Sequence, residues 1–215
     1  DSSTSRGLGD VYKRQVIIEL NANKYSKVIF MELLQGLLNR VSIQRLESPP
    51  PTKAQLEVML QAALRAPDHA NLKPWRSVMV AGEGLTELGA ILHQAQLERA
   101  PESDAQTLER CIKMPHRAPS ILVLIASPKE HPKVPEAEQI QATAAAGHAI
   151  LLAAHAQHLG AVWRTGWVVS HPMVREAFDV TADEQIIAMI YLGTPSVTPK
   201  PAPIISSQDF IKHWH

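Results

Sequence analysis

The sequence predicts an α+β domain in which helices pack on a central sheet. Three observations support this fold class. Helix-like and strand-like patterns are intermixed along the chain, and one helix-like segment, residues 136–159, is much longer than the connections around it. No Gly-x-Gly-x-x-Gly segment follows a predicted strand, and the sequence contains no Walker-type phosphate loop. A doubly wound nucleotide-binding fold is therefore disfavoured.

The first half of the chain predicts two helices joined by a rigid connector. Leucines at helical spacing predict a helix over residues 31–40. Prolines 49–51 form a stiff connector, and Thr52 with Gln55 makes the capping-box pattern that starts the next helix. The apolar face of that second helix consists of Leu56, Met59, Leu60, Ala63 and Leu64. Pro67 ends it.

The rest of the chain predicts alternating strands and helices. Strands are predicted at 77–81, 121–126, 161–169 and 186–192, and helices from Gly84, over 104–113, over 136–159 and from residue 170 or 171. Gly160 is expected to cap the long helix at its C-terminus. Small residues on one face of that helix predict close approach of a second helix. Four prolines from Pro195 onward predict an extended tail.

We expect residues 31–215 to form a single domain. Residues 1–30 are predicted to be a non-native or disordered extension, because the Ser/Gly-rich start has no hydrophobic period and residues 10–15 resemble a translated transposon end. They lack the apolar core of a secretory signal. The natural start is expected at Met31.

Composition excludes several classes of function. Acidic and basic residues balance at 21 each, which argues against non-specific binding of nucleic acid or anionic membranes. The longest apolar run, 121–126, is too short to span a bilayer. One cysteine, Cys111, excludes an intramolecular disulfide framework and a cysteine-based zinc cluster. A cytoplasmic location is the expectation that follows.

Three polar segments are candidates for binding chemistry. They are residues 39–42 at a helix end, the loop 65–76 after Pro67, and residues 163–166 within a predicted strand. The first and third each place an arginine within two residues of a hydroxyl residue, a combination suited to holding a phosphate. Three histidines on the long helix are too few to predict a metal site.

These residues carry a resemblance to the nitroreductase superfamily over about 180 residues in the expected order. The matching segments are 38–42, 65–69 with 74–76, 117–119, 133–135 with 138–139, 163–166, 174–178 and 191–195. The segment Ala66-Pro67-Asp68-His69 is the most specific part. The resemblance implies a sandwich with a central mixed, mostly antiparallel sheet flanked by helices, and a C-terminal tail that embraces a partner subunit.

The resemblance also implies FMN bound at the interface of a homodimer. The residues that fall on flavin-binding segments of one subunit are Arg40, Val41, Ser42, Trp163, Arg164 and Thr165. Arg65 and His69 would reach the same flavin from the partner chain. A weaker similarity to the family places a nicotinamide-nucleotide segment at Ala153, Ala154, His155, Ala156, Gln157 and His158.

Two positions depart from the family pattern. A second arginine usually stands where this chain has Val41, and glutamine usually stands where it has Lys73, so one cation is lost and another is placed on a different loop. We assign Lys73 to the binding of substrate or nicotinamide nucleotide. Which arginine contacts the phosphate and which the flavin ring stays open.

The expected activity is that of an FMN-dependent oxidoreductase. NADH or NADPH would supply hydride to the flavin, which reduces a nitroaromatic, a quinone or a similar acceptor by ping-pong turnover. The flavin carries the chemistry, so no catalytic side chain is predicted. The alternatives are a flavin-sequestering protein with little turnover, and a superfamily member that performs reductive dehalogenation or oxygen chemistry. The physiological acceptor and the nucleotide preference stay open.

Overall fold

The computed structural model describes residues 33–214, so the prediction for residues 1–30 lies outside the described part. The helices are α1 (Leu33–Asn39), α2 (Lys53–Ala63), α3 (Glu83–Arg99), α4 (Ala105–Lys113), α5 (Glu136–Ala156) and α6 (Pro172–Ala177). The strands are β1 (Leu46–Glu47), β2 (Trp75–Ala81), β3 (Ser120–Ala126), β4 (Gly160–Arg164) and β5 (Gln185–Pro195). Short 3-10 turns are η2 (His69–Asn71), η3 (Pro115–Arg117), η4 (Trp167–Val169) and η5 (Ser207–Phe210).

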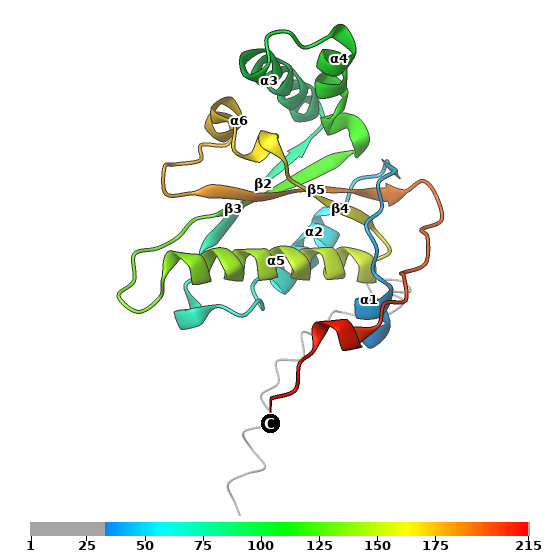
Figure 1. Cartoon of the computed structure of the whole chain (residues 1–215). Coiled ribbons are helices and arrows are strands. Elements are labelled where there is room, and N and C mark those ends of the chain that lie inside the picture. Colours follow the sequence, from blue (N-terminus) through cyan, green and yellow to red (C-terminus); the bar gives the residue numbers. More distant parts are fainter. Residues whose placement is uncertain (1–32, 215) are drawn as a thin grey trace, which may run out of the picture. The chain divides into compact units, whose positions relative to one another are not determined.

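The sheet is built around β5, which pairs with β1, β3 and β4, while β2 pairs with β3. Every pairing among the described strands is antiparallel. Helices α2 and α5 cover one face of the sheet, and α3, α4 and α6 cover the other (Figure 1). The predicted α+β sandwich is therefore confirmed.

Each face of the sheet has its own core, because side chains alternate along the strands. Residues 121, 123 and 125 of β3 pack with Leu85, Leu88 and Leu92 of α3. Residues 122 and 124 pack with Met59 of α2 and Ile150 of α5. All seven residues of β3 are buried, as its unbroken apolar run predicts. The alternation decides which face each candidate side chain reaches.

The start of α2 follows the predicted capping box. The backbone N–H of Gln55 donates to the Thr52 hydroxyl at 3.2 Å, and the backbone N–H of Thr52 donates to the Gln55 side chain at 2.9 Å. Both otherwise unpaired donors at this helix end are thereby satisfied. The cap fixes where α2 begins, and hence where the loop after Pro67 emerges.

The predicted cap of the long helix was wrong. Helix α5 ends at Ala156, and His158, rather than Gly160, takes the left-handed conformation at the helix end (φ 58°). The N–H of Leu159 then donates to the carbonyl of Ala154 at 3.0 Å, closing the helix end. Gly160 belongs to β4 instead, where a Cβ would lie 2.3 Å from Leu46 Cδ2.

The predicted strand 161–169 was too long. Strand β4 ends at Arg164, because Gly166 adopts φ 99° and the chain turns into η4. The two-residue strand β1 was not predicted at all. The small-residue face of α5 packs within the chain: a Cβ on Gly147 would lie 2.4 Å from the Trp163 ring. No described helix is long and apolar enough to cross a membrane.

Candidate functional site

The fold brings the first and third candidate segments together at β4. The N–H of Ile43 donates to the carbonyl of Ala161 at 3.0 Å, so the chain after α1 lies beside this strand. Arg40 and Val41 are half-buried there and Ser42 is exposed. The segment 40–42 and Trp163 therefore lie close together in space, and their sharing one site stays a prediction.

Alternation along β4 separates the side chains of Trp163 and Arg164. Trp163 faces α5, where Gly147 leaves room for its ring. Arg164 faces the other side and places its guanidinium 5.4 Å from the ring centroid of Tyr191 on β5. The register explains this contact, because Val162 pairs with Tyr191 and Arg164 lies two residues further along the same face. The sequence could not predict Tyr191 here, since only the strand register joins positions so far apart.

Arg164 has an unsatisfied buried donor. Its Nε atom is buried and has no hydrogen-bond partner in the described structure. A buried donor without a partner costs roughly 1–3 kcal/mol, so native proteins rarely leave one unless a ligand or solvent satisfies it. A guanidinium in this state fits an anionic or oxygen-bearing ligand.

The turn after Arg164 is open to solvent. Thr165 and Gly166 are exposed, and a Cβ built on Gly166 would meet no atom within 4 Å. The glycine is therefore required for its positive φ of 99° and not for lack of space. The open space beside this turn can admit a flat ligand close to the backbone.

The loop after Pro67 is held tightly by its own polar residues. The Asp68 carboxylate, whose side chain is only 2% exposed, accepts from the backbone N–H of Lys73 at 2.7 Å and from its ammonium at 3.1 Å. Burial acts to raise the pKa of Asp68, but these hydrogen bonds and the charge of Lys73 outweigh it and lower the pKa. Ala70, Asn71 and Lys73 all have positive φ. Such strain is typical of functional loops.

Lys73 is therefore engaged within its own loop. Its ammonium also contacts the Asn71 side chain and lies 5.8 Å from the Trp75 ring centroid. Because it neutralises the buried Asp68, it does not replace the cation missing at Val41. Its predicted role in binding substrate or nucleotide stays a prediction.

Within one chain the loop and Arg40 lie at opposite ends of α5. His69 Nδ1 is 2.8 Å from a carboxylate oxygen of Glu138, near the start of the helix. Arg40 lies near His155, in its last turn, where its charge acts on the histidine. The interval from 138 to 155 spans about 25 Å at the helical rise of ~1.5 Å per residue. His69 and Arg40 of one chain therefore do not meet at the same part of one ligand.

In the predicted nucleotide segment 153–158, most side chains are already buried or hydrogen-bonded within the chain. Ala154 is fully buried. The Gln157 amide donates to the carbonyls of Gln55 (3.2 Å) and Ala153 (3.0 Å). Burial, followed by the charges of Arg40 and His158, lowers the pKa of His155, whose buried Nε2 has no partner in the described residues. Ala153 and Ala156 are half-buried and His158 is exposed, so few side chains remain for a nucleotide.

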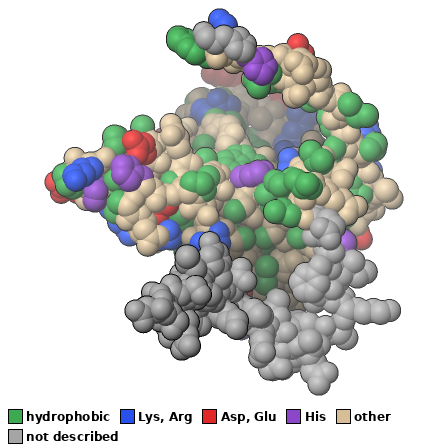
Figure 2. Space-filling model, turned by 90° about the horizontal axis from the view of Figure 1, so that it is seen from below, with side chains coloured by type: hydrophobic (Ala, Val, Ile, Leu, Met, Phe, Trp, Pro, Cys, Tyr) green, Lys and Arg blue, Asp and Glu red, His purple; other side chains and the backbone are tan. Residues whose placement is uncertain are grey.

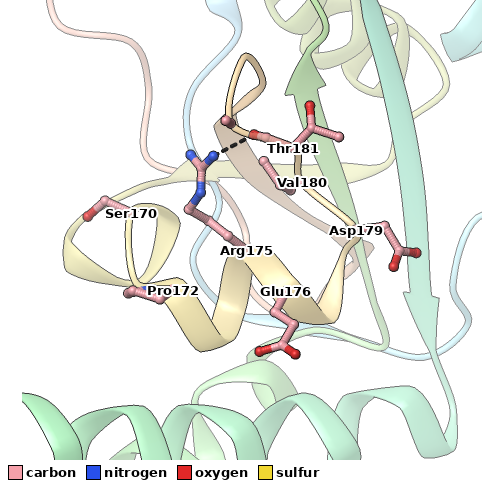
Figure 3. Close-up of a pocket in the computed structure, with 8 residues that line it drawn as sticks. Ser170, Pro172, Arg175, Glu176, Asp179, Val180 and Thr181 are labelled. Atoms are coloured by element: carbon pink, nitrogen blue, oxygen red, sulfur yellow. Dashed lines mark hydrogen bonds between the residues drawn. The ribbon is translucent and has the colours of Figure 1, made fainter.

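A surface hollow of the described chain lies away from these residues. It has a volume of about 920 Å³ and is lined by residues from Ser170 to Ala182, including Arg175, whose guanidinium donates to the Thr181 carbonyl (Figure 3). None of the predicted flavin residues lines it. No group of three or more potential metal ligands occurs among the described residues.

Apolar side chains are exposed on α1 and on the tail. Figure 2 shows apolar side chains spread over the side of the molecule that α1 and α5 cover. Leu33, Leu34 and Leu38 of α1 are each more than 70% exposed, and Trp214 in the tail is 99% exposed. Exposed apolar side chains of this kind make α1 and the tail candidates for a contact with another chain.

Comparison with known proteins identifies the family. The model of the nitroreductase family matches residues 37–194. The chain is 37% identical over 183 residues to the Escherichia coli (strain K12) protein named "Putative NAD(P)H nitroreductase YdjA", covering 82% of this chain and 99% of that protein.

Two solved structures share the fold. One is a nitroreductase-like family protein from Bacillus cereus, with TM-score 0.73, 20% identity, and coverage of 88% and 99% of the two chains. The other is a mutant of the FMN and NADPH-dependent nitroreductase NfnB from Sphigopyxis sp. strain HMH, with TM-score 0.66, 18% identity, and coverage of 85% and 99%. From the family match and the identity to the Escherichia coli protein together, this chain belongs to the nitroreductase family.

Proposed function

We propose that this protein is an FMN-dependent oxidoreductase that takes hydride from NADH or NADPH and reduces a nitroaromatic, quinone or similar acceptor by ping-pong turnover. The observation that carries the proposal is Arg164 Nε, a buried and unpartnered donor on a strand beside the Arg40–Ser42 segment. Relatives named for NAD(P)H and FMN support the choice of cofactor and donor.

The residues of β4 and its neighbouring segment would hold the flavin. Arg40 and Arg164 supply positive charge for the phosphate and for the electron-rich edge of the ring, and Ser42 with Thr165 supplies hydroxyl donors. Trp163 supplies a rigid apolar surface, and Val41 contributes backbone contacts. Preorganised cations are effective here, because they stabilise negative charge without reorganisation at the moment of reaction.

The flavin, when bound, supplies the hydride chemistry itself. The chain's own residues would bind it and orient it. One open face can serve nucleotide and acceptor in turn, which agrees with ping-pong turnover and with the few side chains left free in segment 153–158.

We further propose a homodimer with two composite sites. The roughly 25 Å between the helix positions that accompany His69 and Arg40 favours delivery of Arg65 and His69 by the partner subunit. The exposed apolar residues of α1 and the extended tail supply surface for such a partner.

Purification and reduction test the cofactor and the activity. The protein should carry a yellow chromophore that acid releases as FMN, and NADH or NADPH should bleach it under nitrogen. A nitroaromatic acceptor should then restore the colour. Bleaching without reoxidation by any acceptor would favour a flavin-sequestering role. Release of FAD instead of FMN, or a protein without flavin after supplementation, would contradict the proposal.

Mixing two damaged chains tests the composite site. One chain carries Arg65→Ala and His69→Ala, and the other carries Arg40→Ala and Arg164→Ala. After subunit exchange each heterodimer should regain one intact site and part of the activity. A flavin-loaded monomer in sedimentation, or no regained activity, would contradict the shared site.

A further inference from the structure

The first two turns of helix α5 hold the loop that contains η2. The Thr143 hydroxyl oxygen is 3.0 Å from the carbonyl oxygen of Pro74. The Gln139 side chain accepts from the backbone N–H of Lys129 and donates to its carbonyl, both at 2.8 Å. The Lys129 ammonium in turn donates to the carbonyl of Leu72. Because Thr143 and Gln139 are both buried, these contacts fix the backbone of the loop.

Glu138, in the same part of the helix, contacts a side chain of the loop and not its backbone. Its carboxylate oxygen is 2.8 Å from His69 Nδ1, and the two side chains are 47% and 55% exposed. Exposed ion pairs of this kind add little to stability. Since Thr143, Gln139 and the buried Asp68 already hold the loop backbone, the main effect of Glu138 is on the orientation of the His69 ring.

The contact with Glu138 also selects which ring nitrogen of His69 carries the hydrogen. A carboxylate only accepts hydrogen bonds, so Nδ1 must donate, and the neutral imidazole then has its lone pair on Nε2. Within residues 33–214, His69 Nε2 has no hydrogen-bond partner. Nε2 is therefore the ring nitrogen that a ligand can use, and in the neutral ring it is an acceptor.

We propose that Glu138 is a positioning residue for His69, which it holds in the Nδ1–H form so that Nε2 accepts a hydrogen bond from the flavin. The inference rests on the proposed function, in which His69 reaches the flavin of the composite site. Flavins carry suitable donors in the ring N3–H and in the ribityl hydroxyls. Glu138 acts through His69 alone, which gives a role to residue 138 in the matching segment 138–139.

The first arm of the test measures the tautomer and needs no flavin. Long-range proton–nitrogen NMR spectra of the ¹⁵N-labelled apoprotein are recorded at about pH 8.5, where an ordinary imidazole is neutral. The spectrum of His69→Gln identifies the His69 signals. We expect the Nδ1–H form in the native protein and a mixture of tautomers in Glu138→Ala. Glu136→Ala is the matched control and should keep the native form, because Glu136 is an exposed acid of the same first turn that takes part in no ion pair of the described chain.

The second arm measures whether Glu138 acts through His69. FMN is titrated into four apoproteins: the native protein, Glu138→Ala, His69→Ala and the double variant. Glu138→Ala should weaken FMN binding about fivefold in the native background, the effect of one hydrogen bond between neutral groups. In the His69→Ala background the same substitution should change the affinity by less than twofold, because the ring that it orients is gone.

Three outcomes would overturn the positioning role. The first is a native His69 in the Nε2–H form, and the second is a tautomer that does not change in Glu138→Ala. The third is an effect of Glu138→Ala on FMN affinity that is absent, or equal in the two backgrounds, as a merely structural role predicts. A native protein that binds no flavin would instead refute the proposed function, and with it the part of His69 in binding, while the NMR arm would still decide whether Glu138 sets the tautomer.

Discussion

Two half-buried arginines on the same sheet differ in whether the folded chain supplies hydrogen-bond partners for their guanidinium groups. Arg76 on β2 donates from Nε to Glu184 Oε1 at 2.8 Å and from Nη2 to Oε2 at 2.7 Å. Its Nη2 also contacts the carbonyls of Phe178 (3.0 Å) and Asp179 (2.9 Å). Arg164 on β4 has no such partner and leaves Nε buried and unpaired.

The difference predicts a structural role for Arg76 and a binding role for Arg164. The two-point contact with Glu184 attaches the loop before β5 to β2. Because this contact uses the Nε and Nη2 donors, Arg76 cannot offer the same pair of donors to a ligand. Arg164 leaves its buried Nε unpaired, a costly state that a ligand or solvent would relieve. An arginine's partners in the folded chain therefore tell which role it has.

Removing the acid from the structural pair should have the largest effect. Glu184→Ala leaves the Arg76 charge without its carboxylate, and we expect a loss of about 3 kcal/mol in the free energy of unfolding. Urea denaturation measures this, with Glu109→Ala as the control, because Glu109 pairs with Lys113 on an exposed helix face. Equal midpoints for the two variants would break the comparison.

Acid should weaken the same pair. The hydrogen bonds from Arg76 lower the pKa of Glu184 from 4.5 to about 2. A carboxylate with a lowered pKa stabilises the fold fully above pH 4.5, and that stability is lost as the pH falls from 4.5 towards 2. The full shift corresponds to about 3 kcal/mol, and solvent screening at Arg76 reduces it to roughly 2 kcal/mol.

Thermal unfolding between pH 2 and pH 6 measures this loss. Because other carboxylates titrate in the same range, the readout is the difference between the native protein and Glu184→Gln. That difference should shrink as the pH falls through this window. A difference that stays constant down to pH 2 would show that Glu184 titrates normally.

The turn after Arg164 should be moderately sensitive. Gly166→Ala must keep φ near 99°, which strains any side chain, although the space around a Cβ is empty. We expect a cost of about 1 kcal/mol in unfolding free energy and a weaker flavin affinity. Gly82→Ala is the matched control, because Gly82 also has positive φ (58°) and open space but lies at the start of α3. Weaker flavin binding in both variants would remove the special role of this turn.

The sequence predicted what local patterns decide. The capping box at Thr52, the buried strand β3 and the long helix α5 depend on neighbouring residues, and the structure contains all three. The end of α5 was missed because a histidine, His158, adopts the left-handed conformation that usually indicates glycine.

The candidate segments were visible in the sequence, but the partners of their side chains were not. Arg76 and Arg164 have similar sequence contexts, since each follows a tryptophan at a strand. Only the long-range packing pairs Arg76 with Glu184 and places Arg164 over Tyr191. The sequence therefore identified candidate segments, while only the tertiary structure shows which of their side chains lack a partner within the chain.

The most direct test compares flavin affinity and stability in Arg164→Gln. FMN is titrated into the apoprotein by fluorescence, and urea unfolding of the same apoprotein is measured in parallel, with Arg76→Gln as the reference. We predict that Arg164→Gln weakens FMN binding by roughly 1.5–3 kcal/mol and changes unfolding by less than about 0.5 kcal/mol, whereas Arg76→Gln mainly reduces stability. Unchanged FMN affinity in a folded Arg164→Gln protein would contradict the assignment of Arg164 as a binding residue.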